Sequence, residues 1–156
     1  MSAKIHEIID APISELEPAK PICVEPTLSI GDTIKTMQKH KIGCVLVSDG
    51  DELLGIFSER DLLMRFYDSD KKGEMPISEF MTVNPECLEP HHPLAYALNR
   101  MSMGGYRHIP ILDHHGHPAG IISVKDIVNH LVAHVPEAVY NLPPEPGMHS
   151  ASREGA

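Results

Sequence analysis

The sequence predicts an α/β (α+β) protein made of two β-α-β-β-α repeats, because an internal duplication, helical spacing and short apolar strands agree. Residues Ile13-Ser14-Glu15-Leu16 align with Ile77-Ser78-Glu79-Phe80 when the chain is shifted by 64 positions. After one inserted residue, Gly55-Ile56-Phe57-Ser58-Glu59-Arg60-Asp61 aligns with Gly120-Ile121-Ile122-Ser123-Val124-Lys125-Asp126 at a shift of 65. Collinear matches of this kind indicate a duplicated unit.

Each repeat contains the same elements in the same order. A short strand is predicted first, at residues 23–24 and 87–88. A helix follows, because apolar residues recur at helical spacing in both copies: Ile30, Ile34 and Met37, then Leu94, Leu98 and Met101. Two strands joined by a Gly- and Asp-containing turn come next, at 44–47 and 53–57 and again at 108–112 and 119–122. The last strand leads directly into a second helix.

The two repeats are expected to depend on each other. A unit of about 60 residues is marginal alone, so the copies should pack through their sheets with pseudo-two-fold symmetry. The chain then divides into an N-terminal segment with the first repeat at 1–70 and the second repeat at 71–135. Residues 136–156 are rich in Pro and polar residues, which predicts a tail without its own core.

Composition predicts a soluble, cytoplasmic protein with an aliphatic core. Of the 156 residues, 42% are hydrophobic, but only 4% are aromatic and none is Trp. No apolar run approaches the roughly 18 residues that span a bilayer, and acids stand where a signal peptide needs an apolar stretch. The three cysteines form no CxxC pair, which favours buried thiols over a disulfide or zinc framework.

The net charge and the absence of catalytic motifs argue against a nucleic-acid-binding protein and against an enzyme. The formal net charge of −9 argues against a nucleic-acid surface, which needs a basic stripe. A phosphorylated small molecule is not excluded, since a pocket can be locally basic. The sequence has no G-x-S-x-G, Walker or G-x-G-x-x-G motif, so we predict neither catalysis nor a required cofactor.

Two Ser-x-x-Asp motifs, Ser58 to Asp61 and Ser123 to Asp126, stand where a strand becomes a helix. The spacing predicts a capping box, in which Ser caps the first turn and the acid bonds back. The same place also fits an anion site, because a helix N-terminus presents unpaired N–H groups and Ser adds a hydroxyl. Each motif includes a cation that would face the same anion: Arg60 and Lys125.

These motifs resemble those of the cystathionine-β-synthase (CBS) domain family. Tyr106-Arg107-His108-Ile109-Pro110-Ile111 is similar to the family's strand-entry segment, and Met81-Thr82 to the phrase that opens many family copies. The pair resembles a Bateman module over about residues 8–135. The resemblance implies a homodimer, often a flat disc, which binds AMP, ADP, ATP, S-adenosylmethionine or NAD(H) in clefts between the domains and regulates a partner.

The resemblance also implies which residues hold the ligand. The acid of each motif, Asp61 or Asp126, would hold the ribose. An apolar adenine slot would be lined by two sets of residues, for each of which plain core packing is the alternative: Cys23, Val24, Ile42, Gly43 and Cys44, and Cys87, Leu88, Tyr106, Arg107 and His108. Arg107 and His108 are polar at a strand entrance and would reach a phosphate, so their site is expected to hold phosphate more tightly.

The chain also contains eleven histidines, which raise the alternative of a metal site. His114, His115 and His117 occupy a predicted turn, and His130 and His134 share a helix face. The turn cluster has no rigid scaffold and no HExxH motif is present, so solvated positions are predicted instead.

The sequence therefore predicts a regulatory module that binds an adenine nucleotide and transmits occupancy to an unidentified protein through linkage. One alternative is a ligand-free module for dimerisation and protein interaction. The other is a metal-responsive, His-rich protein.

Overall fold

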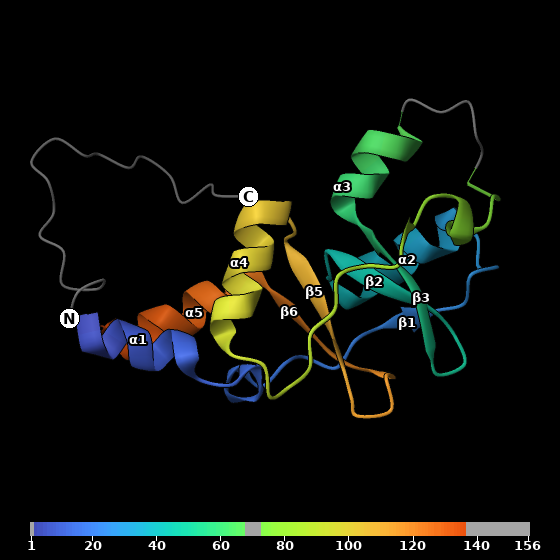
Figure 1. Cartoon of the computed structure of the whole chain (residues 1–156). Helices are drawn as coiled ribbons and strands as arrows, with labels where there is room; N and C mark the ends of the chain where they lie inside the picture. The colour runs from blue at the N-terminus through green and yellow to red at the C-terminus, as the bar shows by residue number, and fades with distance from the viewer. Residues whose placement is uncertain (1, 68–72, 137–156) are drawn as a thin grey trace, which may run out of the picture.

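The structure is a computed structural model that describes residues 2–67 and 73–136 (Figure 1). Its elements in chain order are the helix α1 (Ser2–Asp10), the 3-10 helix η1 (Ile13–Leu16), β1 (Cys23–Val24), α2 (Ile30–His40), β2 (Cys44–Asp49), β3 (Glu52–Ser58), α3 (Glu59–Asp61), the π-helical turn η2 (Leu62–Phe66), the 3-10 helix η3 (Ile77–Glu79), β4 (Thr82–Val83), α4 (Leu94–Gly104), β5 (His108–Leu112), β6 (Pro118–Ser123) and α5 (Val124–His134). The predicted tail lies outside the described residues from 137 onward.

The sheets confirm the predicted β-α-β-β-α order, except that the strand predicted at 87–88 is only an isolated bridge at Leu88. In the first sheet β1 runs parallel to β2, and β3 is antiparallel to both β2 and β4. The second sheet pairs β5 with β6 in antiparallel fashion. Isolated bridges supply its outer partners, Leu88 parallel to Ile111 and Ala19 antiparallel to Ile121. The two sheets are therefore equivalent, with the outer strands of the second reduced to single bridges.

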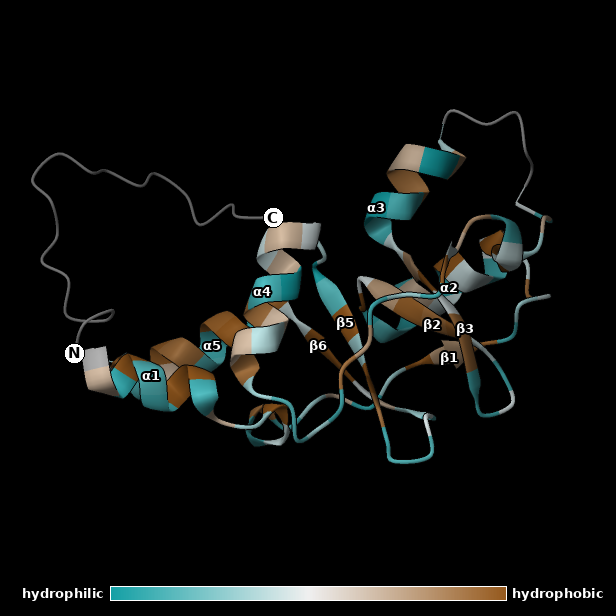
Figure 2. Cartoon of the chain, viewed as in Figure 1, coloured by the Kyte–Doolittle hydropathy of each residue, from teal (hydrophilic) through white to brown (hydrophobic). Residues whose placement is uncertain are grey.

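Helix ends follow the local sequence. Ser29 caps α2 by accepting a hydrogen bond from the backbone N–H of Asp32. The helix α4 ends at Gly105, whose φ of 69° is the left-handed conformation that glycine adopts without strain. Hydrophobic residues concentrate along the strands and on the helix faces that cover them (Figure 2).

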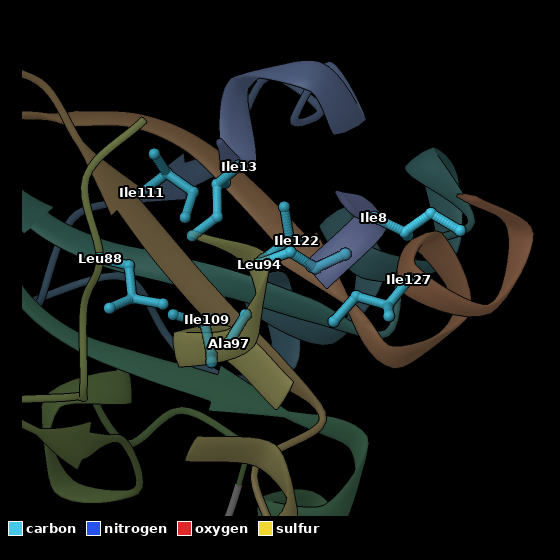
Figure 3. Close-up of a cluster of buried hydrophobic side chains, with 9 residues drawn as sticks. All are labelled: Ile8, Ile13, Leu88, Leu94, Ala97, Ile109, Ile111, Ile122 and Ile127. Atoms are coloured by element: carbon cyan, nitrogen blue, oxygen red, sulfur yellow. The ribbon is translucent and has the colours of Figure 1, made fainter. Parts of the chain in front are cut away.

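The two hydrophobic cores interleave along the chain. Ile13 lies before β1 of the first repeat but is fully buried in the second core, among the residues drawn in Figure 3. Its N–H donates to the carbonyl of His92 at 2.9 Å. The equivalent residue Ile77 is fully buried in the first core, and its N–H donates to the carbonyl of Leu28 at 2.8 Å. Segments 1–70 and 71–135 thus each contribute to both cores.

Glycine makes room for these crossing segments. A Cβ at Gly55 would lie 2.8 Å from the carbonyl oxygen of Thr82 in β4. A Cβ at the equivalent Gly120 would lie 2.8 Å from Cβ of Pro18. The glycine that begins each strand-to-helix motif therefore permits the close approach of a segment from outside its own repeat.

No helix among the described residues is both long enough and apolar enough to cross a membrane.

Candidate functional site

Both Ser-x-x-Asp motifs form complete capping boxes. In the first, Oδ2 of Asp61 accepts hydrogen bonds from the N–H and the Oγ of Ser58, both at 2.9 Å. In the second, Oδ2 of Asp126 accepts from the N–H and the Oγ of Ser123, at 2.7 and 2.8 Å. One oxygen of each carboxylate is therefore committed to the helix start, as the capping interpretation predicts.

The second oxygen distinguishes the two motifs. Oδ1 of Asp61 accepts from Oγ1 of Thr82 at 3.3 Å and lies 3.6 Å from Nε of Arg65. No group in the described parts of the chain donates to Oδ1 of Asp126. The Asp61 carboxylate is thus held by neighbours, whereas that of Asp126 keeps one oxygen for another donor.

A cleft of about 450 Å³, here called the larger cleft, lies between the two repeats at the Ser58 motif. The first repeat and β4 with its following segment form one side, and the end of α4 with the entrance of β5 forms the other. Its lining residues are Gly43, Ile56, Ser58, Glu59, Arg60, Asp61, Arg65, Thr82, Val83, Asn84, Pro85, Glu86, Gly104, Gly105, Tyr106, Arg107 and His108.

One hydrogen bond crosses the larger cleft. Nη1 of Arg60 donates to the carbonyl of Gly105 at 3.0 Å, and Gly105 caps the C-terminus of α4. A cation at this helix end interacts favourably with the helix dipole. Arg60 therefore connects the helix start of one repeat with a helix end of the other.

A second cavity of about 160 Å³, the smaller cleft, lies at the Ser123 motif. Its walls are mainly apolar, and Ser123 and Asp126 stand at its polar end. The lining residues are Ala19, Lys20, Ile22, Ile42, Gly43, Cys44, Leu46, His108, Ile121, Ile122, Ser123 and Asp126. Gly43 and His108 line both clefts, so they form a shared wall.

Burial sets the protonation of two groups at this wall. Burial lowers the pKa of the His108 imidazole and the nearby Arg107 lowers it further, against the opposite effects of Asp126 and Glu59. Burial raises the pKa of the Cys44 thiol to about 12, with help from the Glu59 carboxylate. Cys44 is therefore a thiol rather than a thiolate at neutral pH.

Most of the predicted ligand residues lie in the clefts. The larger cleft brings together Ser58, Arg60, Asp61, Gly43, Tyr106, Arg107 and His108. The smaller cleft brings together Ser123, Asp126, Ile42, Gly43, Cys44 and His108. Arg107 thus lines the same cleft as Asp61 of the first repeat, and Cys87 and Leu88, with which the sequence grouped it, do not.

Five predicted residues line neither cleft: Cys23, Val24, Cys87, Leu88 and Lys125. Val24 and Leu88 are buried in the two cores, as the core-packing alternative predicts. The Sγ of Cys87 donates to the carbonyl of Pro85. Cys23 is exposed, which corrects the prediction that the cysteines are all buried.

The segment just before each first strand supplies residues that the prediction missed. Ala19, Lys20 and Ile22 line the smaller cleft, and residues 82–86 line the larger one. The repeat contained the signal, because residues 19–22 align with 83–86 at the shift of 64.

The histidine clusters do not assemble into a metal centre among the described residues, where no group of three or more His, Cys, Asp or Glu side chains could hold an ion. The rings of His114 and His115 contact each other, with centroids 3.8 Å apart. Those of His130 and His134 do so at 4.3 Å.

Comparison with known proteins identifies the family. The model of the CBS domain matches residues 13–68 and again residues 77–133. The chain belongs to the CBS domain family. It contains two CBS domains in tandem, and the matched ranges coincide with the two repeats.

Among curated relatives, the chain is 28% identical over 121 residues to an uncharacterised 17.7 kDa protein of Acidianus ambivalens, covering 77% of this chain and 73% of that protein. It is 30% identical over 118 residues to the CBS domain-containing protein CBSCBSPB3 of Arabidopsis thaliana, covering 75% of this chain. That match spans about a fifth of the plant protein, 21% of its length.

Solved structures share the CBS-pair fold. The CBS-domain protein ATU1752 of Agrobacterium tumefaciens matches with a TM-score of 0.69 and 31% identity, over 76% of this chain and 98% of that one. CBSX2 in complex with AMP matches with a TM-score of 0.69 and 20% identity, over 78% and 96% of the chains. The CBS pair of MJ0100 in complex with 5-methylthioadenosine and S-adenosyl-L-methionine matches with a TM-score of 0.71 and 22% identity, over 79% and 97%.

Proposed function

We propose that this CBS pair is a non-catalytic regulatory module that binds AMP, ADP or ATP in the larger cleft and transmits occupancy to a protein partner. The observation that carries the proposal is a single cleft that both domains line and that contains a Ser-capped helix start and three arginines. Two solved proteins of the same fold are complexes with adenosine-containing ligands, which supports the ligand class.

The polar groups of the larger cleft suit the parts of a nucleotide. Asp61 and Thr82 lie together and offer a carboxylate and a hydroxyl to a ribose. Arg107 and Arg60 come from opposite sides and offer guanidinium groups to a phosphate. Apolar contacts for a base come from side chains on both sides: Ile56, Val83, Pro85 and Tyr106.

The smaller cleft suits an adenosyl group without phosphates. Its volume of about 160 Å³ is small, and its walls are apolar except near Ser123 and Asp126. The free Oδ1 of Asp126 would accept ribose hydroxyls without competing with the capping box. We therefore assign phosphate-bearing ligands to the larger cleft.

Transmission follows from the position of the ligand between the domains. A ligand that contacts both sides favours one arrangement of the two CBS domains, and a partner that prefers this arrangement binds more tightly. The Arg60 to Gly105 hydrogen bond already links the two sides in the free protein. A phosphate that engages Arg60 competes with this bond.

We extend the proposal to a homodimer formed by the helical segment α3–η2. Leu63, Met64 and Tyr67 expose 67%, 76% and 85% of their surface there. In the second domain, α1 packs against α4, and its Ile8 joins the core that also contains Ile127 of α5, the helix equivalent to α3–η2. The first domain has Leu63, Met64 and Tyr67 exposed on α3–η2, and a second copy of the chain would cover these three side chains.

A second candidate is a ligand-free interaction module. Both oxygens of Asp61 already have partners in the free protein, so the first motif is explained without a ligand. This candidate predicts unchanged stability with every nucleotide.

Thermal unfolding with AMP, ADP, ATP, S-adenosylmethionine and NADH tests the proposal. A ligand at about 100 times its Kd stabilises the fold by about 2.7 kcal/mol, a readily measured increase in Tm. Arg107→Gln is the informative variant, because the described residues give Arg107 no ion pair or hydrogen bond that its loss would disrupt. Lys39→Gln, on an exposed turn of α2 away from both clefts, is the matched charge control.

The expected result is an increase in Tm with one or more adenine nucleotides that is reduced in Arg107→Gln and retained in Lys39→Gln. An unchanged Tm with all five ligands would favour the interaction module.

A further inference from the structure

His108 lies in the wall between the two clefts. It is the first residue of β5 and lines both cavities. Opposite it, a Cβ added to Gly43 would lie only 3.7 Å from Cε1 of the imidazole. No group in the described parts of the chain forms a hydrogen bond with the ring. The imidazole is therefore close to a ligand in either cleft and free to respond to it.

The formal charges of the larger cleft cancel when His108 is neutral. Its lining contains three guanidinium groups and three carboxylates: Arg60, Arg65 and Arg107, and Glu59, Asp61 and Glu86. Glu86 also lies 3.6 Å from Arg100, which is outside the lining. Protonation of His108 adds one positive charge to an otherwise balanced surface. The charge state of this one ring therefore decides how strongly the cleft attracts an anion.

The arginines of the cleft are only partly available to a phosphate. Nη1 of Arg65 donates to the carbonyls of Phe80 and Met81, at 3.1 and 2.9 Å. Arg60 donates to the carbonyl of Gly105. Arg107 alone among the three has no such partner in the described residues. These hydrogen bonds leave the charges of Arg60 and Arg65 in place but occupy some of their donors, so a dianionic phosphate beside Arg107 would gain from a further cation that can donate to it.

The imidazole of His108 is the group that can become this cation. Burial is the main reason why its pKa lies below the usual value, so the ring is neutral in the free protein at pH 7. The charged groups nearest to it are Glu59 on α3, Asp126 on α5 and the adjacent Arg107. Further titratable groups line the same two clefts: Lys20, Cys44, Arg60, Asp61, Arg65 and Glu86.

We propose that His108 takes up one proton from water when a phosphate group binds in the larger cleft, which couples nucleotide binding by this chain to pH. The inference rests on the proposed function, since it concerns the same cleft. An adenosyl ligand without phosphate brings no anion to the ring and binds without proton uptake. His108 would thus favour phosphorylated ligands increasingly as the pH falls.

The sign of the effect follows from linkage. A bound phosphate stabilises the imidazolium, so His108 has a higher pKa in the complex than in the free protein. Between these two values binding takes up protons, and affinity increases up to about tenfold for each unit by which the pH falls. The phosphate monoester has its own second pKa near 6, and cations favour its dianion, so its contribution is proton release. Proton uptake by His108 and proton release by the phosphate therefore have opposite signs, and a measurement of the net number of protons exchanged distinguishes them.

Calorimetric titration of the full chain with AMP near pH 7, in buffers of different ionisation enthalpy, measures protons exchanged on binding. Adenosine serves as the ligand without phosphate. His108→Gln removes the titrating ring and keeps a polar side chain of similar length, and His114→Gln in the exposed turn is the matched control. Side-chain NMR of the wild-type chain follows the His108 resonances directly as pH changes, with and without inorganic phosphate.

Proton uptake with AMP that is absent with adenosine, lost in His108→Gln and kept in His114→Gln supports the inference. Equal proton exchange by wild type and His108→Gln overturns it while leaving nucleotide binding established. If AMP does not bind at all, the NMR titration decides separately. In that case, a rise in the His108 pKa on addition of inorganic phosphate supports the coupling although AMP is not the ligand. An unchanged His108 pKa then overturns both the coupling and the proposed nucleotide site.

Discussion

Ile13→Ala is the sharpest test of the interleaved cores. The side chain is fully buried in the second core although it belongs to the first repeat. Truncating a buried Ile to Ala removes about 2–5 kcal/mol of stability, from a total of about 5–15 kcal/mol for a typical domain. With a urea m-value of about 2 kcal/mol/M, the unfolding midpoint should fall by roughly 1–2.5 M. Ile5→Ala, at a position 49% exposed on α1, should shift it far less.

Amide hydrogen exchange identifies which strands are destabilised by Ile13→Ala. Protection should be lost first in β5 and β6, because Ile13 packs among residues of these strands and not against β2 or β3. The reasoning would be refuted by a variant as stable as the wild type. It would also be refuted by early exchange in β2 and β3 while β5 and β6 remain protected.

Three further predictions concern single residues. Gly55→Ala should lower the urea midpoint, because the new Cβ would lie 2.8 Å from the Thr82 carbonyl oxygen; an unchanged midpoint would contradict the close approach of β4. Gly43→Ala should leave the midpoint nearly unchanged, since its Cβ would lie no closer than 3.5 Å to any neighbour, yet weaken AMP binding in calorimetry by filling the shared wall. Unweakened binding would show that the ligand does not reach this wall. Cys23, which is exposed, should react with Ellman's reagent at about pH 8 far faster than Cys44, whose pKa burial raises to about 12. Fast labelling that persists in Cys23→Ser would contradict this order.

Helix starts and strand ends could be predicted from the sequence, because they depend on residues that are close together along the chain. The Ser-x-x-Asp spacing predicted both capping boxes. The predicted strands at 108–112 and 119–122 agree with β5 and β6 to within one residue at each end. These features depend on residues three or four positions apart, which periodicity and capping preferences describe directly.

Which residues line each cleft was harder to predict from the sequence, because the clefts are formed by segments that are distant along the chain. Arg107 was grouped with its own repeat, yet it shares a cleft with Asp61, since each cleft combines a helix start from one repeat with a strand entrance from the other. Val24 and Leu88 have the side-chain types of an adenine slot, but Val24 in β1 and Leu88 at its isolated bridge both lie in the cores. Pattern alone does not say toward which side a residue of a two-residue strand points.

The exchange of leading segments also bears on how such a protein could arise. A chain with one repeat and its own leading segment would hold an incomplete core, since the residue equivalent to Ile13 or Ile77 is buried in the opposite repeat. Two such chains would complete each other by trading these segments, as in a domain-swapped dimer. Gene duplication and fusion of that dimer would give the arrangement seen here. On this view, separate expression of the two halves should yield poorly folded fragments that recover their structure only when mixed.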